Sequence, residues 1–132
     1  MLAEGGNALD AAVATNLVLG VVTPYHCGPG GDLFALVWDG GRAIGCNGSG
    51  RAPAAATLEA VVEATGGAGE IPPFGALAVT VPGAVEAWFA LLSRFGTRDF
   101  AALAAPAVAL AEDGFELSRE GASWFDSARE PY

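Results

Sequence analysis

The segment from Leu33 to Trp38 is apolar at every position. Because side chains of a β-strand alternate between its two faces, a strand of this composition needs cover on both. The next residues, Asp39-Gly40-Gly41, are typical of a tight hairpin turn, and the chain returns from Arg42 to Asn47. The sequence therefore predicts a buried β-hairpin inside a layered fold.

Helical patterns flank this hairpin and make the fold class α/β. Asn7 is a favourable N-cap for a helix from Ala8 to Val22 that ends at Thr23-Pro24, and Asp10 suits its positive end. A short helix capped by Thr57 and running through Glu63 comes next, followed by a strand from Ala76 to Val81. We then expect a helix from Ala84 to Phe95 with Gly96 as its C-cap, and a helical stretch that is capped by Thr97, interrupted by Pro106 and ended by Gly114. A last helix begins at Ser118 and ends at Pro131-Tyr132.

Composition excludes several classes of protein. With 52% hydrophobic and 16% charged residues the chain is not disordered. The net charge is −9 and no basic cluster is present, so neither nucleic acid nor an anionic membrane is an expected partner. No signal-peptide pattern is present, and the apolar run from Val13 to Val22 is too short to span a bilayer, which takes about 20 residues. Localisation stays open.

The few histidine and cysteine residues of the sequence do not indicate a metal site or a catalytic thiol. A single histidine and two cysteines do not make a tetrahedral zinc site, so no metal is expected. We expect Cys27 and Cys46 to be reduced and buried. His26 precedes Cys27, but neighbours in an extended chain point to opposite sides, which argues against a thiolate pair. Core packing is expected to explain Trp38, Trp88 and Trp124.

Two glycine-rich segments invite catalytic interpretations that their spacing does not support. Gly28-Pro29-Gly30-Gly31 lacks the preceding strand and the following Lys-Ser/Thr of a phosphate loop, and a tight turn explains it better. Gly48-Ser49-Gly50 matches the centre of a nucleophile elbow, but Asn47 occupies the position that requires glycine. The residues alone therefore give an α/β scaffold without a nucleophile–base pair.

An ordered series of motifs covers nearly the whole chain and resembles the γ-glutamyltranspeptidase family. The segment Gly5 to Ala14 resembles the GGNAxDAAVA signature of that family. The later blocks follow in the same order and at similar spacing: Gly28 to Phe34, Ala52 to Ala56, Gly75 to Gly83, Phe95-Gly96-Thr97, Leu103 to Ala107, and Leu110 to Phe115.

The resemblance implies an N-terminal-nucleophile hydrolase with a four-layer αββα sandwich, of which this chain is a partial portion. Such enzymes are precursors that cleave themselves into a large and a small subunit. The new N-terminal Thr of the small subunit attacks a γ-glutamyl amide, such as glutathione, and forms an acyl-enzyme that water or an amine resolves. The implied partners are this small-molecule amide donor and the small subunit from the same precursor, and no cofactor is implied.

The resemblance places the nucleophile in a Thr-Thr-His-like motif outside these residues, so no catalytic residue is assigned here. No threonine of the chain is followed by Thr or His: Thr15, Thr23, Thr57, Thr65, Thr80 and Thr97. We expect residues 1–132 to be the N-terminal part of the large subunit, truncated at its C-terminal end. Because Met1 to Glu4 has helical composition without a preceding cap, we expect truncation at the N-terminal end also.

The chain departs from the family at the substrate-binding loop. In the glutathione-cleaving members an Arg-Glu pair precedes Ala-Pro by one residue, and its Arg clamps the α-carboxylate of the substrate. Aligned on Ala52-Pro53, those positions hold Ser49 and Gly50, which removes the bidentate clamp. Arg51 lies two residues after Ser49, on the same face of an extended chain. It is either a partial substitute for the clamp or a surface residue in an ion pair.

We therefore assign substrate binding to Ser49, Gly50 and Arg51 as a hypothesis. Two alternatives to a γ-glutamyl-cleaving enzyme stay open. One is a related amidohydrolase or acylase with a different donor. The other is a non-catalytic remnant that acts only as a scaffold for pairing with another subunit. A downstream Thr-Thr-His segment would separate the enzymes from the remnant.

Overall fold

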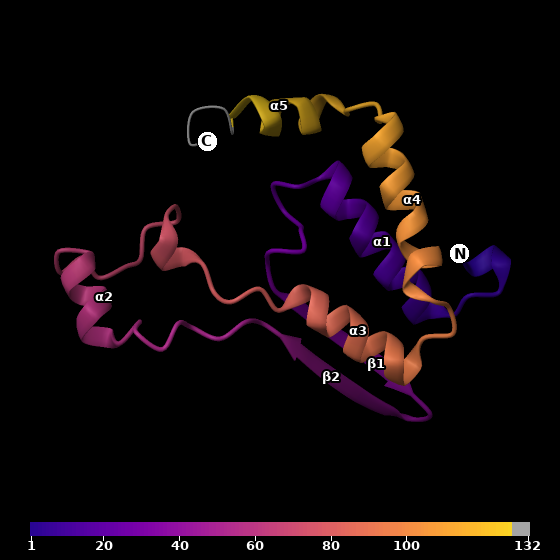
Figure 1. Ribbon diagram of the computed structural model, residues 1–132, viewed down its shortest axis with the longest axis horizontal. Helices are drawn as coiled ribbons and strands as arrows, with labels where there is room; N and C mark the ends of the chain where they lie inside the picture. The colour runs from indigo at the N-terminus through magenta and orange to yellow at the C-terminus, as the bar shows by residue number, and fades with distance from the viewer. Residues whose placement is uncertain (128–132) are drawn as a thin grey trace.

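The computed structural model describes residues 1–127 and places helices on one face of a β-hairpin (Figure 1). Strands β1 (Leu33–Asp39) and β2 (Arg42–Gly48) are antiparallel, and Leu36 lies opposite Gly45 in the register. The turn places Gly40 and Gly41 at φ angles of 56° and 102°, a region that favours glycine because it has no Cβ. The predicted hairpin is confirmed.

The first long helix, α1 (Ala8–Val22), follows a short 3-10 turn at Leu2–Glu4 and is capped as predicted. The Asn7 side chain accepts a hydrogen bond from the Asp10 amide at 2.9 Å. In return the Asp10 carboxylate accepts one from the Asn7 amide at 2.8 Å, which completes a capping box. Asp10 is nevertheless completely buried, so it does more than favour the helix dipole.

Buried Asp10 also holds the connection between α3 (Ala84–Phe95) and α4 (Phe100–Asp113). Its carboxylate accepts hydrogen bonds from the Thr97 amide, the Thr97 hydroxyl and the Arg98 amide. Burial by itself would raise the pKa of Asp10. The hydrogen bonds from the Thr97 hydroxyl and from the Asn7, Thr97 and Arg98 amides outweigh it and lower the pKa from 3.8 to about 2.

The core lies between α1, α3, α4 and the inner face of the hairpin. Trp88 of α3 is buried, and its indole N–H donates to Asn16 Oδ1 at 2.8 Å. Leu103 of α4 is fully buried against α1. The remaining members of this cluster are Val13, Ala14 and Ala84, with Leu17, Leu33, Leu92 and Phe100 packed around them.

Two features of α4 differ from the sequence prediction. Its N-cap is Asp99, which accepts from the Ala102 amide at 2.9 Å, because the Thr97 hydroxyl is already used by Asp10. Pro106 does not interrupt the helix. It lies on the exposed side and removes only one backbone donor, while Leu103 and Ala107 are buried on the side that packs along α1. The predicted end at Gly114 is confirmed.

The described residues cover the hairpin on one face only, so cover of its second face stays a prediction. Phe34, Leu36 and Trp38 of β1 point away from the helices and are 70%, 77% and 73% exposed. Trp38 is therefore no part of the core. Trp124 is also half exposed, stacked on Tyr25, so core packing explains only Trp88 of the three tryptophans.

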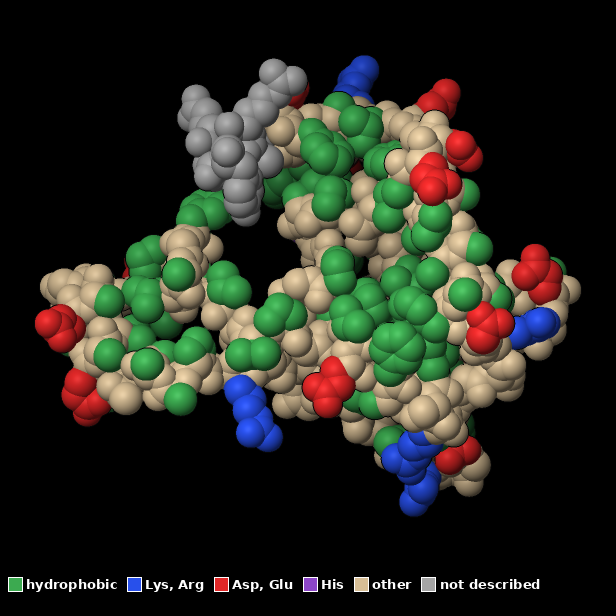
Figure 2. Space-filling view, in the orientation of Figure 1, with side chains coloured by type: hydrophobic (Ala, Val, Ile, Leu, Met, Phe, Trp, Pro, Cys, Tyr) green, Lys and Arg blue, Asp and Glu red, His purple; other side chains and the backbone are tan. Residues whose placement is uncertain are grey.

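A projecting arm joins β2 to α3 and carries α2 (Leu58–Ala64) (Figure 1). Thr57 caps α2 as predicted, accepting from the Ala60 amide at 3.3 Å. The predicted strand from Ala76 to Val81 is absent from the described structure: Ala76–Ala78 is a 3-10 helix, and the residues after it pair with no neighbouring strand. Hydrophobic side chains gather on this arm and over α3 (Figure 2).

The last helix, α5 (Arg119–Ser127), begins as predicted, with Ser118 Oγ accepting from the Gly121 amide at 3.0 Å. Its predicted end at Pro131-Tyr132 lies outside the described residues. Tyr25, which follows α1, packs against both Trp124 and Phe125 of α5, and His26 packs against Tyr25 and Trp124. These ring contacts hold α5 near the end of α1. Within residues 1–127 no helix has the length and apolarity needed to cross a membrane.

Candidate functional site

The end of β2 lies where three separate segments of the chain meet. Asp32, which closes the glycine-rich loop, accepts hydrogen bonds from the Gly50 amide at 3.2 Å and from the Thr80 hydroxyl at 3.1 Å through the same carboxylate oxygen. The Val81 amide donates to the Arg51 carbonyl at 3.0 Å. Asp32 thus fixes the segment after β2 against the turn that leads into α3.

The glycine-rich loop also holds the start of α3. The Gly31 carbonyl accepts from the amides of Gly83 and Ala84 at 3.1 and 3.0 Å. The Gly31 amide donates to the Gly28 carbonyl at 3.3 Å, so this segment forms the predicted tight turn. The Gly31 carbonyl therefore joins the end of this loop to the start of α3.

Glycine is required where these segments touch. A Cβ on Gly50 would lie 1.3 Å from the Val81 carbonyl oxygen, and one on Gly83 would lie 2.3 Å from the Gly48 carbonyl oxygen. Neither separation is sterically possible, so a side chain at Gly50 forces the segment around Val81 to move. A glutamate at position 50, which the family resemblance would lead one to expect, does not fit this backbone.

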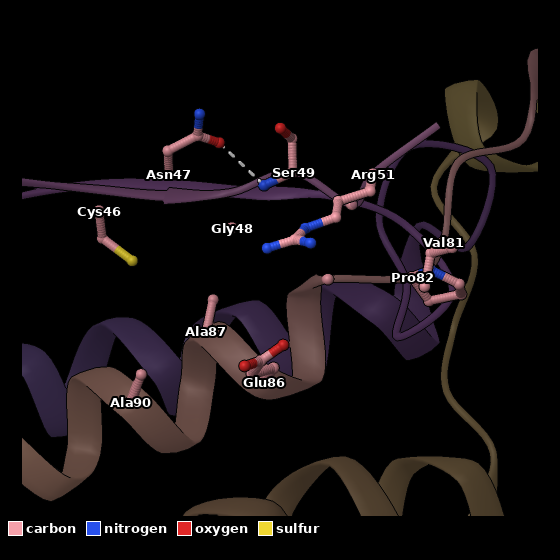
Figure 3. Close-up of a pocket in the computed structure, with 12 residues that line it drawn as sticks. Cys46, Asn47, Gly48, Ser49, Arg51, Val81, Pro82, Glu86, Ala87 and Ala90 are labelled. Carbon is pink, nitrogen blue, oxygen red and sulfur yellow. Dashed lines mark hydrogen bonds between the residues drawn. The ribbon is translucent and has the colours of Figure 1, made fainter. Parts of the chain in front are cut away.

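A pocket of about 340 Å³ lies between the end of β2 and the first turns of α3 (Figure 3). One wall is the segment from Cys46 to Arg51, and the other is formed by α3, where the small side chains of Ala87 and Ala90 leave room. The charged groups of the lining are Arg51 and Glu86. The complete lining is Cys46, Asn47, Gly48, Ser49, Gly50, Arg51, Val81, Pro82, Gly83, Glu86, Ala87 and Ala90.

Ser49, Gly50 and Arg51 all line this pocket, but their side chains do not share one face. The Ser49 hydroxyl points away from α3, whereas the Arg51 guanidinium lies on the α3 side of the chain (Figure 3). The same-face expectation for Ser49 and Arg51 is therefore wrong. Its premise was an extended chain, but β2 ends at Gly48 and the Ser49 amide turns back to donate to Asn47 Oδ1 at 3.0 Å.

Arg51 is exposed, and its side chain forms no ion pair or hydrogen bond with any residue from 1 to 127. Pairing with a neighbouring carboxylate, one of the two sequence-based alternatives, is not seen in the described part of the chain. Glu86 faces the same pocket from α3 and also lacks a charged partner there. No local sequence pattern connects these two residues, because they lie 35 positions apart. The hydrogen bonds of Asp32 and the bond from the Val81 amide to the Arg51 carbonyl bring their segments together.

Other candidate groups lie away from this pocket. The His26 ring packs against Tyr25 and Trp124, with centroid distances of 4.8 and 5.1 Å, and does not approach Ser49 as a base would. Cys27 and Cys46 are free thiols, as expected, but both are only half-buried. In the described structure no group of three His, Cys, Asp or Glu side chains is placed to hold a metal ion.

Comparison with known proteins gives a consistent result. The family model for gamma-glutamyltranspeptidase matches residues 1–131. A glutathione hydrolase-like proenzyme of Bacillus subtilis, YwrD, is 39% identical over 123 residues, which are 91% of this chain and 23% of that protein. The chain therefore spans about a quarter of the length of this curated relative.

Solved structures of two kinds of enzyme share the fold. The γ-glutamyltranspeptidase of Helicobacter pylori has a TM-score of 0.88 and 36% identity, over 99% of this chain and 38% of that one. A cephalosporin acylase from Bacillus halodurans has a TM-score of 0.89 and 46% identity, over 98% of this chain and 24% of that one. The mixed helix-and-sheet structure is thus a partial portion of the N-terminal-nucleophile hydrolase fold, as the sequence predicted.

Proposed function

This chain belongs to the gamma-glutamyltranspeptidase family, and from that premise we propose that it forms the N-terminal part of the large subunit of an enzyme that hydrolyses or transfers the acyl group of γ-glutamyl amides such as glutathione. One observation carries the proposal. The end of the glycine-rich loop holds the segment before Ala52-Pro53 and the turn at Pro82-Gly83 together through the hydrogen bonds of Asp32 and Gly31, and these last two segments line one pocket.

In this proposal the chain contributes binding and positioning, and the nucleophile comes from a small subunit of the same precursor. The hydroxyl of an N-terminal Thr attacks the donor amide carbonyl while its own amine accepts the hydroxyl proton. The amine part of the donor leaves with a proton, and water then hydrolyses the ester bond of the acyl-enzyme. No cofactor enters this cycle, and no residue of this chain is the nucleophile.

The architecture suits a partner that completes the fold. The chain supplies a helical layer and a sheet layer, and the outer face of the hairpin exposes Phe34, Leu36 and Trp38. Apolar sheet faces of this kind pack against a second sheet. We assign that second sheet to the remainder of the polypeptide, including the small subunit, which gives the αββα sandwich expected of the family.

The donor-binding role falls to the segment Ser49–Gly50–Arg51. Arg51 is the cation of the pocket, so it would bind the donor's carboxylate from the α3 side. Because Ser49 replaces the arginine of the glutathione-cleaving relatives, a γ-glutamyl donor would bind less tightly. A charge-assisted hydrogen bond contributes roughly 1.5–3 kcal/mol, which corresponds to about one to two orders of magnitude in affinity.

A specific observation also favours an acylase as a second candidate. The missing clamp weakens the case for glutathione, and the chain is 46% identical to the cephalosporin acylase but 36% identical to the γ-glutamyltranspeptidase of Helicobacter pylori. In an acylase the same pocket and the same Thr chemistry would act on a different amide acid. If neither donor is cleaved, the remaining hypothesis is a non-catalytic scaffold that only pairs with another subunit.

The proposed function is tested on the protein expressed from its natural gene. Mass spectrometry should detect cleavage into two subunits, the smaller beginning with Thr, and a γ-glutamyl anilide should be hydrolysed. Cleavage of an acylated β-lactam amine in preference to the anilide would establish the acylase instead. An unprocessed protein inactive toward both substrates would contradict the proposal and leave the scaffold.

A further inference from the structure

A single carboxylate oxygen, Asp32 Oδ1, connects the two chain segments that enter the pocket at the end of β2. It accepts hydrogen bonds from the Gly50 amide at 3.2 Å and from the Thr80 hydroxyl at 3.1 Å. Gly50 lines the pocket, and Thr80 comes directly before Val81, where the segment that leads to α3 joins the lining. Asp32 itself is not among the lining residues, so any effect it has on the pocket passes through Gly50 and Thr80.

The connection through Asp32 depends on a side chain, whereas the neighbouring contacts do not. Another hydrogen bond between the two segments runs from the Val81 amide to the Arg51 carbonyl at 3.0 Å, and a backbone bond of this kind does not require a particular side chain. Gly50 also approaches Val81 so closely that a Cβ would lie 1.3 Å from the Val81 carbonyl oxygen. The two segments therefore meet without room for a side chain, and an outward movement of either one changes the width of the pocket.

We propose that Asp32 is a positioning residue for this pocket, and that its two hydrogen bonds set the separation between the segment at Gly50 and the segment at Thr80. Without the acceptor oxygen, the Gly50 amide and the Thr80 hydroxyl would bind water, and the two segments would be free to separate. A donor would then bind less tightly, because binding must first restore the separation. This inference rests on the proposed function, because it takes the pocket to be the place where the donor binds.

Kinetics of the protein expressed from its natural gene test the acceptor oxygen separately from the charge. Asp32→Ala removes the oxygen and should raise KM for γ-glutamyl anilide about tenfold at unchanged kcat, since Asp32 does not act on the bond that breaks. Asp32→Asn keeps a carbonyl oxygen and should restore KM to within about threefold of the parent. Thr80→Val removes one of the two hydrogen bonds and should raise KM about threefold, and Thr80→Ser should restore it.

The two cysteines provide a measurement that needs no turnover. Cys46 lines the pocket and Cys27 does not, and both are free, half-buried thiols. Separation of the two segments should expose Cys46, so its alkylation by iodoacetamide, followed by mass spectrometry, should be about threefold faster in Asp32→Ala than in the parent or in Asp32→Asn. The alkylation rate of Cys27 should not change. A variant that only unfolds more often would alkylate faster at both cysteines.

Two matched controls remove the same groups at exposed sites outside the pocket. Asp39→Ala in the hairpin turn and Thr15→Val on α1 should leave both KM and the alkylation rate of Cys46 unchanged.

Three results would overturn the inference: an Asp32→Ala variant with the KM and the Cys46 alkylation rate of the parent, a fall in kcat at unchanged KM, or equal acceleration of both thiols. If Asp32→Ala does not fold, Thr80→Val and its restoration by Thr80→Ser give the same decision. A parent that does not hydrolyse the anilide would contradict the proposed function alone, and the alkylation of Cys46 would then decide the inference about Asp32.

Discussion

Asp10 of α1 and Thr97, which follows α3, are joined by two hydrogen bonds across 87 positions of the chain. The Thr97 amide donates to Asp10 Oδ1 at 2.9 Å, and the Thr97 hydroxyl donates to Asp10 Oδ2 at 2.5 Å. The same carboxylate caps its own helix through the Asn7 amide. A single buried side chain therefore fixes the start of α1 to the connection between α3 and α4, and so aligns the three helices that support the hairpin.

Removing the Asp10 carboxylate should destabilise the folded chain. Asp10→Ala leaves the Asn7, Thr97 and Arg98 amides without their acceptor in a buried site, and we expect the free energy of unfolding to fall by about 2–4 kcal/mol. Asp39→Asn in the hairpin turn is the control and should change it by less than about 0.5 kcal/mol, because both residue types suit an exposed turn. Urea unfolding measures both variants. Equal stabilities would refute the role given to Asp10.

The same interaction predicts a pH dependence. Hydrogen bonding lowers the pKa of Asp10 to about 2, below its ordinary value of 3.8, so the folded state binds its proton less readily than the unfolded state. The contribution of Asp10 is therefore complete above pH 4 and is lost as the pH falls through about 2. The difference in unfolding free energy between the parent and Asp10→Asn should shrink over this range. A difference that stays constant from pH 5 to about 2 would contradict this assignment.

The close contact at Gly50 predicts a strong effect from one methyl group. Gly50→Ala places a Cβ against the Val81 carbonyl and should destabilise the protein by about 1–3 kcal/mol. Gly45→Ala in β2 is the matched control, since its Cβ would meet nothing within 4 Å, and it should be neutral or slightly stabilising. Thermal unfolding compares the two. A Gly50→Ala variant as stable as Gly45→Ala would show that the two segments do not touch as described.

Local sequence patterns were sufficient where the structure is decided by neighbouring residues. Asn7 caps α1, Gly40-Gly41 turns the hairpin and Ser118 begins α5 because each interaction spans only a few residues. Thr97 was assigned to the wrong role because its hydroxyl binds Asp10, far away in the sequence. The strand predicted from Ala76 to Val81 failed for a related reason: its composition suits a strand, but no described strand lies beside it.

The candidate site was predicted only in part. The motif alignment located Ser49, Gly50 and Arg51, and all three line the pocket. Their orientation was missed because the turn at Asn47 ends the extended chain. Glu86 was missed because a carboxylate in the first turn of a helix is ordinary. Long-range hydrogen bonds of Asp32, Gly31 and Val81 bring that turn near Arg51. These tertiary contacts have no signature in local sequence.

The bare hairpin face predicts that the purified 132-residue chain associates. Phe34, Leu36 and Trp38 form a contiguous apolar surface, and surfaces of this kind recruit other chains. Leu36→Lys should reduce both association in sedimentation velocity and the binding of a hydrophobic dye. Leu58→Lys on the arm is the control, since Leu58 is similarly exposed but lies off the hairpin. A strictly monomeric parent with a cooperative thermal transition and no dye binding would count against this prediction.

The central claim is that this chain belongs to the donor-binding part of the enzyme and lacks its nucleophile. The most direct measurement follows release of the chromophore from a γ-glutamyl anilide incubated with the purified 132-residue chain. We predict no release above the uncatalysed rate, because no N-terminal Thr is present. Sustained turnover that copurifies with the chain through repeated purification, and persists in controls for contaminating transpeptidase, would contradict the account.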